Sequence, residues 1–303
     1  MIKWLRKLQS TLEKHPSLRL PEPSLIAKRL SQCLDPSLPH GLHSITLQVY
    51  DTIFAQKLAS PDSLDHTFAL FAAGIIPFFP KASIDIKAEI LTLIQKHLVL
   101  IADQLDFVMP GVVPALLSEI DETSSQEITR LVISLINEFT FRNGKAVHYA
   151  IWQSLIKNPK VRQGGIRYLS VYLDSPGRDD LFELLPQSSI VMNALLGCLE
   201  DSNILVKRSI LDFIISYFPL QTNFFAQNEK VALVEAVLYI MIKKDPTLQR
   251  RVWELALGPE LQATPQKIRL LLELLTSALV RSSSQWGERI KIFWYAWILW
   301  MNC

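Results

Sequence analysis

The chain has 303 residues, of which 49% are hydrophobic, 20% are charged and only 10 are glycine. So few glycines argue against a turn-rich β protein, and a net charge of +2 is too small to indicate binding to a nucleic-acid backbone. The three cysteines (Cys33, Cys198 and Cys303) are far apart and odd in number, which favours a reducing, cytosolic setting over a disulfide framework.

The first recognisable element is a pair of helices joined by a turn, in residues 27–54. The turn holds a group of metal-ligand residue types, namely Cys33, Asp35, His40 and His43. Their spacing matches no common zinc arrangement, and a structural zinc needs four converging ligands. We therefore interpret these side chains as caps for backbone groups at a helix-to-helix corner.

Two apolar segments are candidates for membrane insertion. Residues 68–80 are apolar but number only 13 and include Pro77. Spanning a bilayer takes about 20 residues, so we expect a helix packed inside the protein. Residues 292–301 are fewer still, and Trp4, Arg6 and Lys7 interrupt any signal-peptide core at the start of the sequence. The pattern predicts a protein that is cytosolic or attached to a membrane surface.

Helical periodicity recurs along the chain. One apolar stripe follows the 3.6-residue period through Ile128, Leu131, Val132, Leu135, Ile136 and Phe139. A capping side chain stands before proline at Asp35-Pro36, Ser60-Pro61, Asn158-Pro159, Asp245-Pro246 and Thr264-Pro265. That order is typical of helix starts. No sustained alternating segment competes with these signals, so the fold class is predicted to be all-α.

The helices recur at a regular interval. Apolar residues near the starts of successive second helices are Leu42, Ile86, Ile128, Val161, Val206 and Leu248. The intervals between them are 44, 42, 33, 45 and 42 residues, and most fall within the roughly 40–47 residues of HEAT and armadillo repeats. We predict an α-solenoid of six or seven helix pairs. The short interval indicates either one degenerate unit or a wrongly chosen residue.

Motifs of common enzymes are absent from the sequence. It contains no phosphate-binding loop, no dinucleotide-binding glycine motif, no H-E-x-x-H and no G-x-S-x-G. His97 falls at a core position of a helix, where we expect a hydrogen-bonded interior residue. We predict no catalytic residue, no metal and no cofactor.

Basic pairs are the most distinctive polar feature. The residues that could align along one edge of a solenoid are Lys207, Arg208, Lys243, Lys244, Arg250 and Arg251. Such an edge would attract anionic lipid headgroups or an acidic partner segment. The competing interpretation, which we favour, is that these side chains cap helix ends or form local ion pairs, for example with Asp201.

The last residues, 289–301, combine a basic start with tryptophan at every third position: Trp294, Trp297 and Trp300. An interfacial membrane helix has this pattern. A misread end is a second alternative. We prefer a third, a truncated solenoid, because terminal repeats normally carry a polar outer face.

Several segments, in order, resemble the N-terminal region of the Dopey family. They are residues 4–12, 27–54, 70–77, 152–166, 201–212 and 248–253. The similarity covers about residues 2–258. We therefore divide the chain into a Dopey-like helical-repeat domain, residues 1–258, and additional helices in residues 259–303.

The resemblance implies a non-enzymatic scaffold in vesicular protein transport between Golgi and endosomes. It implies a cytosolic protein attached peripherally to Golgi, trans-Golgi-network and endosome membranes. The partners it implies are a large Golgi scaffold related to Arf exchange factors, phosphoinositide-bearing membranes and a motor protein, but no nucleic acid. Family members are several times longer, so only their N-terminal module is expected here. The alternative is a HEAT-type binding module of another pathway, such as a transport receptor or a regulatory subunit.

Overall fold

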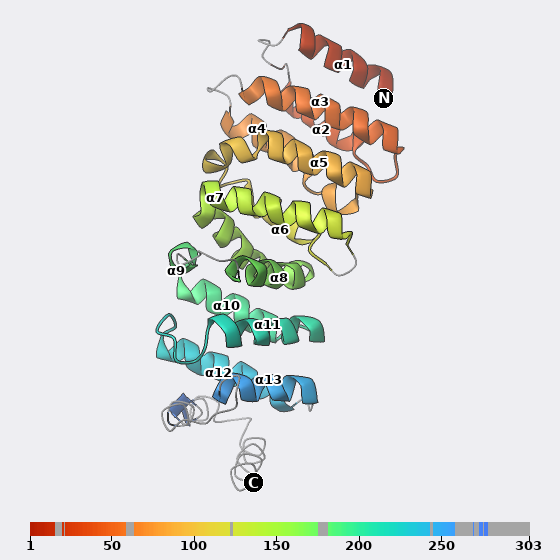
Figure 1. Ribbon diagram of the computed structural model, residues 1–303. Helices are drawn as coiled ribbons and strands as arrows, with labels where there is room; N and C mark the ends of the chain where they lie inside the picture. Colours follow the sequence, from red (N-terminus) through yellow and green to blue (C-terminus); the bar gives the residue numbers. More distant parts are fainter. Residues whose placement is uncertain are drawn as a thin grey trace. The chain divides into compact units, whose positions relative to one another are not determined.

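The computed structural model describes residues 1–15, 20, 22–58, 64–121, 124–174, 181–242 and 245–257, together with residues 269, 273, 274, 276 and 277 (Figure 1). Within these residues there are thirteen α-helices, three short 3-10 helices and no strand. The chain divides into two compact units, one formed by Met1–Ser154 with Val171–Leu184 and the other by Leu155–Ser170 with Leu185–Cys303. The all-α prediction is confirmed.

The first unit is built from two layers of helices. Its helices are α1 (Ile2–Lys14), α2 (Pro23–Cys33), α3 (His40–Leu58), α4 (Leu64–Ile75), α5 (Ile84–His97), α6 (Met109–Leu117), most of α7 (Gln126–Lys157) and the short α9 (Leu181–Leu184). Helices α1, α3 and α5 pack in succession in one layer, and α2 packs against α4 in the other (Figure 1). Helix α3 contacts both α2 and α4, which joins the layers.

The second unit repeats this arrangement. It contains most of α8 (Arg162–Leu173), then α10 (Ser188–Leu199), α11 (Ile204–Tyr217), α12 (Gln227–Ile242) and α13 (Pro246–Leu257). Helix α10 packs against α12 in one layer and α11 against α13 in the other, while α10–α11 and α12–α13 contacts join the layers. Successive helix pairs stacked in two layers form an α-solenoid of the HEAT and armadillo kind.

The six repeat-spaced apolar residues all lie where the interval predicts. Each is buried near the start of a helix or, for Val161, in the 3-10 turn Pro159–Val161 that leads into α8. Each of the six helices is also preceded by another helix: α2, α4, α6, the second half of α7, α10 and α12. All six side chains are at most 5% exposed, as expected of positions that each repeat buries.

The short 33-residue interval has a structural cause. Helix α7 runs for 32 residues and contains a kink at Asn143, whose φ is −143° and ψ is 62°. Two helices that elsewhere are separated by a loop are here joined end to end. The Asn143 side chain supports the join, because its Oδ1 accepts from the backbone N–H of Ala146 at 3.4 Å and its Nδ2 donates to the Ala102 carbonyl at 3.0 Å.

Two of the predicted proline-linked helix starts are confirmed and one is wrong. Asn158 accepts from the Lys160 backbone N–H, and Asp245 caps α13 at Pro246. Asp35 instead forms a turn with Ser37, and α3 begins only at His40. The side chain accepts two residues ahead in all three cases, so Asx-turn geometry by itself does not determine where a helix follows.

Most of the described side chains in the apolar segment 68–80 are buried or half-buried in the first unit, as predicted. Helix α4 ends at Ile75, two residues before Pro77, and Phe71, Ile75 and Phe79 are buried. None of the helices in the described residues is both long and apolar enough to cross a membrane. The Trp-rich residues 289–301 and the pairs Ser60-Pro61 and Thr264-Pro265 lie outside the described residues.

Candidate functional site

The predicted basic edge can be located in part. Lys207 and Arg208 lie near the start of α11, and Arg250 and Arg251 lie in α13, which packs directly against α11. The structure thus brings four of the six residues to one pair of adjacent helices. The other two, Lys243-Lys244, lie outside the described residues.

Two of these arginines form ion pairs between the helices. Arg208 lies 3.6 Å from Asp245, and Arg251 donates to both carboxylate oxygens of Asp212, at 2.6 and 3.1 Å. Arg251 also donates to the Thr247 carbonyl. Their positive charge is therefore balanced by neighbouring carboxylates, as the ion-pair interpretation of the sequence expected.

Lys207 and Arg250 have contrasting environments. Lys207 is buried, with 6% of its surface exposed. The Arg250 side chain is 78% exposed and pairs with Glu254 one turn along α13 at 2.9 Å. An exposed i,i+4 pair of this kind contributes only about 0.3–0.5 kcal/mol. Arg250 is thus the member of the described edge best placed to meet an external anion.

Asp201, which we expected to pair with the neighbouring basic residues, instead binds Arg162 from the preceding repeat. The two side chains approach to 2.7 Å and are only 11% and 6% exposed. Arg162 also donates to the carbonyls of Leu155 and Ile156, which satisfies backbone acceptors at the end of α7. The spacing of 39 residues between the partners could not be foreseen without knowing which helices are adjacent.

Asp201 and Asp245 use their two oxygens in the same way. In each, Oδ1 accepts from backbone N–H groups two residues on, and Oδ2 faces an arginine one repeat earlier. The Thr247 hydroxyl, the backbone N–H groups of Leu248 and Thr247, and the Arg208 guanidinium together lower the pKa of Asp245. The aspartates at these two helix starts therefore link consecutive repeats.

The polar corner before α3 serves the backbone. Asp35 Oδ1 accepts from the Ser37 N–H and hydroxyl, which lowers the pKa of Asp35. His43 Nε2 lies 2.8 Å from the Asp35 carbonyl oxygen, His40 lies 3.9 Å from Asp85, and Cys33 is buried. Across the part of the chain that the structure describes, no group of three or more His, Cys, Asp or Glu side chains converges to hold a metal ion.

His97 is an interior, hydrogen-bonded residue, as predicted. Only 2% of it is exposed, and its Nε2 lies 2.6 Å from Asp51 Oδ1. Lys96 donates to both oxygens of the same carboxylate, at 2.8 and 3.0 Å. Burial raises the pKa of Asp51, but the hydrogen bonds and charges of Lys96 and His97 outweigh it and lower the pKa overall.

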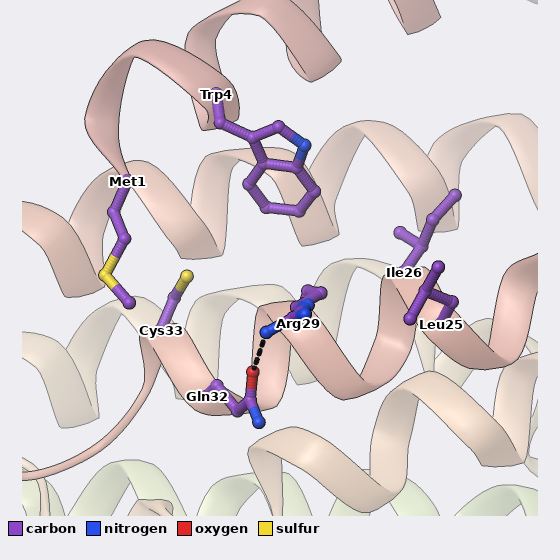
Figure 2. A pocket seen from close by; sticks show the side chains of 7 residues that line it. All are labelled: Met1, Trp4, Leu25, Ile26, Arg29, Gln32 and Cys33. Atoms are coloured by element: carbon purple, nitrogen blue, oxygen red, sulfur yellow. Dashed lines mark hydrogen bonds between the residues drawn. The ribbon is translucent and has the colours of Figure 1, made fainter.

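A groove between α1 and α2 is a concave feature that the sequence did not predict. It has a volume of about 450 Å³ and is lined by Met1, Trp4, Leu25, Ile26, Arg29, Gln32 and Cys33. Figure 2 shows Trp4 descending from α1 toward α2, whose Arg29 donates to Gln32 Oε1 at 3.0 Å. A sequence pattern in α2 could have indicated this groove, because Leu25, Arg29 and Gln32 are spaced at i, i+4 and i+7 and so share one helix face.

Comparison with known proteins identifies the family. A sequence model described as "Dopey, N-terminal" matches residues 1–261. The chain belongs to the Dopey family. The resemblance inferred from the residues is thereby confirmed, and the match covers the first unit and the second unit as far as residue 261.

The relatives of this Dopey-family chain come from distant eukaryotes. It is 29% identical to Protein pad-1 of Caenorhabditis elegans, 28% identical to Protein DOP1 homolog of Drosophila melanogaster and 26% identical to Protein DOP1 of Saccharomyces cerevisiae. These alignments cover 84%, 86% and 84% of this chain but only 10%, 10% and 18% of the respective relatives. The chain therefore spans about a tenth to a fifth of their length.

Proposed function

We propose that the chain is a non-enzymatic scaffold module in vesicular protein transport between Golgi and endosomes. The observation that carries the proposal is its membership of the Dopey family, over residues 1–261. The two-layered helical repeats support it, because stacked helix pairs provide extended surfaces for partners rather than a preorganised reaction centre. The ionisable clusters among the described residues are consistent with this role, since they bind backbone groups and one another.

We further propose a location and partners for the module. The protein associates peripherally with Golgi, trans-Golgi-network and endosome membranes. Its partners are a large Golgi scaffold related to Arf exchange factors and, on the transported membranes, a motor protein. Phosphoinositide headgroups are the membrane component that it meets.

A pull-down of the tagged chain from cell extract, with identification of the bound proteins by mass spectrometry, tests this function. The expected result is enrichment of Golgi and endosome membrane proteins over an unrelated HEAT-type repeat protein used as bait. Recovery of nuclear-import receptors or phosphatase subunits without Golgi components would favour the alternative, a binding module of another pathway, and would refute the transport role.

A further inference from the structure

The groove between α1 and α2 lies where the two-layered pattern of the first unit is incomplete. Helix α1 extends the layer of α3 and α5, while α2 packs against α3 and α4. Among the described residues, no helix continues the layer of α2 and α4 alongside α1. The side of α2 that faces away from α4 is therefore open, next to Trp4 of α1 (Figure 2).

The open position presents apolar side chains to solvent. Met1, Leu25 and Trp4 are 66%, 53% and 41% exposed, and all three line the groove. Ile26 and the buried Cys33 lie deeper along α2. A volume of about 450 Å³ falls within the range of roughly 300–1,000 Å³ typical of sites that enclose a ligand or anchoring side chains.

The surroundings of the groove are basic. The first 34 residues hold seven lysines and arginines but only two acidic residues, whereas the whole chain is nearly neutral at +2. Arg29 is the charged residue among the groove's lining, and it is exposed. Lys3, Lys7 and Lys28 on the same two helices are also exposed. The charge complement of this region is an acidic ligand.

We propose that this groove binds an amphipathic α-helix of a partner protein, with acidic residues flanking an apolar stripe. The stripe, spaced at i, i+3 or i+4, and i+7, enters between Trp4 and Leu25, and a Glu or Asp beside it pairs with Arg29. The bound helix occupies the open position beside α2 and completes the second layer. This inference rests on the proposed scaffold function and names the chemical class of one partner.

The shape of the site favours a helix over a lipid surface. A bilayer cannot enter the space between two helices to reach Ile26 and Cys33, but the side chains of a third helix can, as they do throughout the repeats. Trp4 and Arg29 stand on opposite walls, and these two residue types most often dominate binding energy at protein interfaces. The bond from Arg29 to Gln32 holds the guanidinium at the rim before the ligand arrives.

Selection from a random library of 16-residue peptides displayed on phage, against the purified full chain, tests the inference. The expected result is enrichment of peptides that combine the helical apolar stripe with Glu and Asp. Synthetic versions should bind with about tenfold or greater loss on Trp4→Ala and on Arg29→Glu. Replacing each Glu of the peptide with Lys should abolish binding, and added salt should weaken it.

Control substitutions outside the groove show whether a loss of peptide binding is specific to the groove or reflects loss of folding. Lys145→Glu reverses an exposed charge on α7, outside the groove's lining and its basic surroundings, and Phe141→Ala removes a side chain of α7 that is 89% exposed. Both should bind the selected peptides as the unchanged chain does, and all four variants should retain its far-ultraviolet circular dichroism and melting temperature. Equal losses in the groove and control variants would overturn the assignment.

Other occupants give different outcomes. Failure to enrich any peptide, or enrichment of basic or non-helical ones, would overturn the inference. It would also be overturned if Trp4→Ala abolished self-association in sedimentation, which would indicate a second copy, or abolished binding to phosphatidylserine vesicles without affecting peptides. Because the selection uses purified protein, it can fail while the Golgi pull-down succeeds, and the reverse.

Discussion

Arg162 and Asp201 join two consecutive repeats through a buried ion pair of 2.7 Å. The Asp201 carboxylate also accepts a hydrogen bond from the Asn203 backbone N–H at 2.7 Å. The Arg162 guanidinium also donates to the Leu155 carbonyl at 2.9 Å. One contact thus connects the end of α7, the start of α8 and the loop before α11. The same use of an aspartate recurs one repeat later at Asp245.

Replacing Arg162 with alanine should destabilise the second unit by about 3 kcal/mol, because it leaves Asp201 buried without its countercharge. Urea unfolding measures the loss, and amide hydrogen exchange should place it in α10 and α11. Arg250→Ala removes an exposed pair and should cost less than about 0.5 kcal/mol. Similar losses of unfolding free energy in Arg162→Ala and Arg250→Ala would show that burial of the Arg162 ion pair does not determine its contribution to stability.

Gly74 lies where α4 meets α2 and α3 closely. A β-carbon at this position would lie 2.5 Å from the Tyr50 hydroxyl oxygen and 3.2 Å from Ser31 Cβ. Gly74→Ala should therefore destabilise the first unit by about 1–2 kcal/mol, since overpacking exceeds the gain in helix propensity. Thermal unfolding measures it.

A second substitution, at Tyr50, should compensate for Gly74→Ala, and Gly41 offers a control. Tyr50 is fully buried, its hydroxyl has no hydrogen-bond partner among the described residues, and burial raises its pKa. Tyr50→Phe removes the oxygen that clashes and should recover at least half of the loss in the double variant. Gly41→Ala meets no atom within 4 Å and should not destabilise the protein. Absence of rescue would refute the role of the hydroxyl.

Asn143 maintains the kink in α7 by donating to Asp106 as well as to the Ala102 carbonyl. Asn143→Ala should cost about 1–2 kcal/mol through the lost cap and hydrogen bonds. Asn143→Asp keeps a cap acceptor but places a second carboxylate beside Asp106, and like charges raise the pKa of such a pair. The loss of unfolding free energy in Asn143→Asp should therefore become smaller as pH falls from 7 to 4, whereas the loss in Asn143→Ala should not. Parallel pH dependence would contradict the contact with Asp106.

Asp51 should contribute to acid sensitivity. Its pKa is lowered in the folded protein, so its stabilising contribution is present above the unfolded pKa of about 3.9 and is lost as pH falls through the lower folded value. Asp51→Asn should flatten the fall in unfolding free energy below pH 4, measured by urea unfolding at several pH values. Asp85→Asn, at a side chain that is 86% exposed, should leave the slope unchanged. If the slope were unchanged in Asp51→Asn, this carboxylate would not contribute to the loss of stability at low pH.

The predicted basic edge can be tested on anionic vesicles. If Lys243 and Arg250 meet headgroups, reversing both charges should weaken vesicle binding by at least about 30-fold, since removing each positive charge alone costs roughly 1 kcal/mol. Co-sedimentation with phosphoinositide-containing liposomes measures this. Arg269→Glu is the matched control, because Arg269 is 84% exposed and pairs with Glu273 as Arg250 does with Glu254. Unchanged binding in the double variant would show that the edge does not bind membranes.

Local patterns predicted most of the architecture. The apolar intervals from Leu42 to Leu248 placed six buried helix starts, because each repeat must bury the same face. The cap at Asp245 was predicted from local sequence as well, since the backbone N–H groups that donate to it lie within three residues. The start of α3 was misplaced at Pro36, because an Asx turn can close without leading into a helix.

The candidate site depended on contacts between distant residues. Asp201 was predicted to pair with the nearby basic residues, whereas its partner is Arg162, 39 residues earlier. The groove between Trp4 and Arg29 was not predicted, because the exposure of an apolar side chain depends on which helix lies beside it. No sequence pattern singled out Asn143, and its contact with Ala102 reveals the join that shortens one repeat.

The sequence by itself determined the helical class, the repeat interval and the Dopey-family membership, because these depend on periodicity and on residue order along the chain. Tertiary structure alone decided which arginines are paired and which remain exposed, since an ion pair forms only where packing brings two helices within a few ångströms. It also decided that α1 and α2 leave an open, basic groove, because a vacant position in a layer exists only once its neighbours are in place.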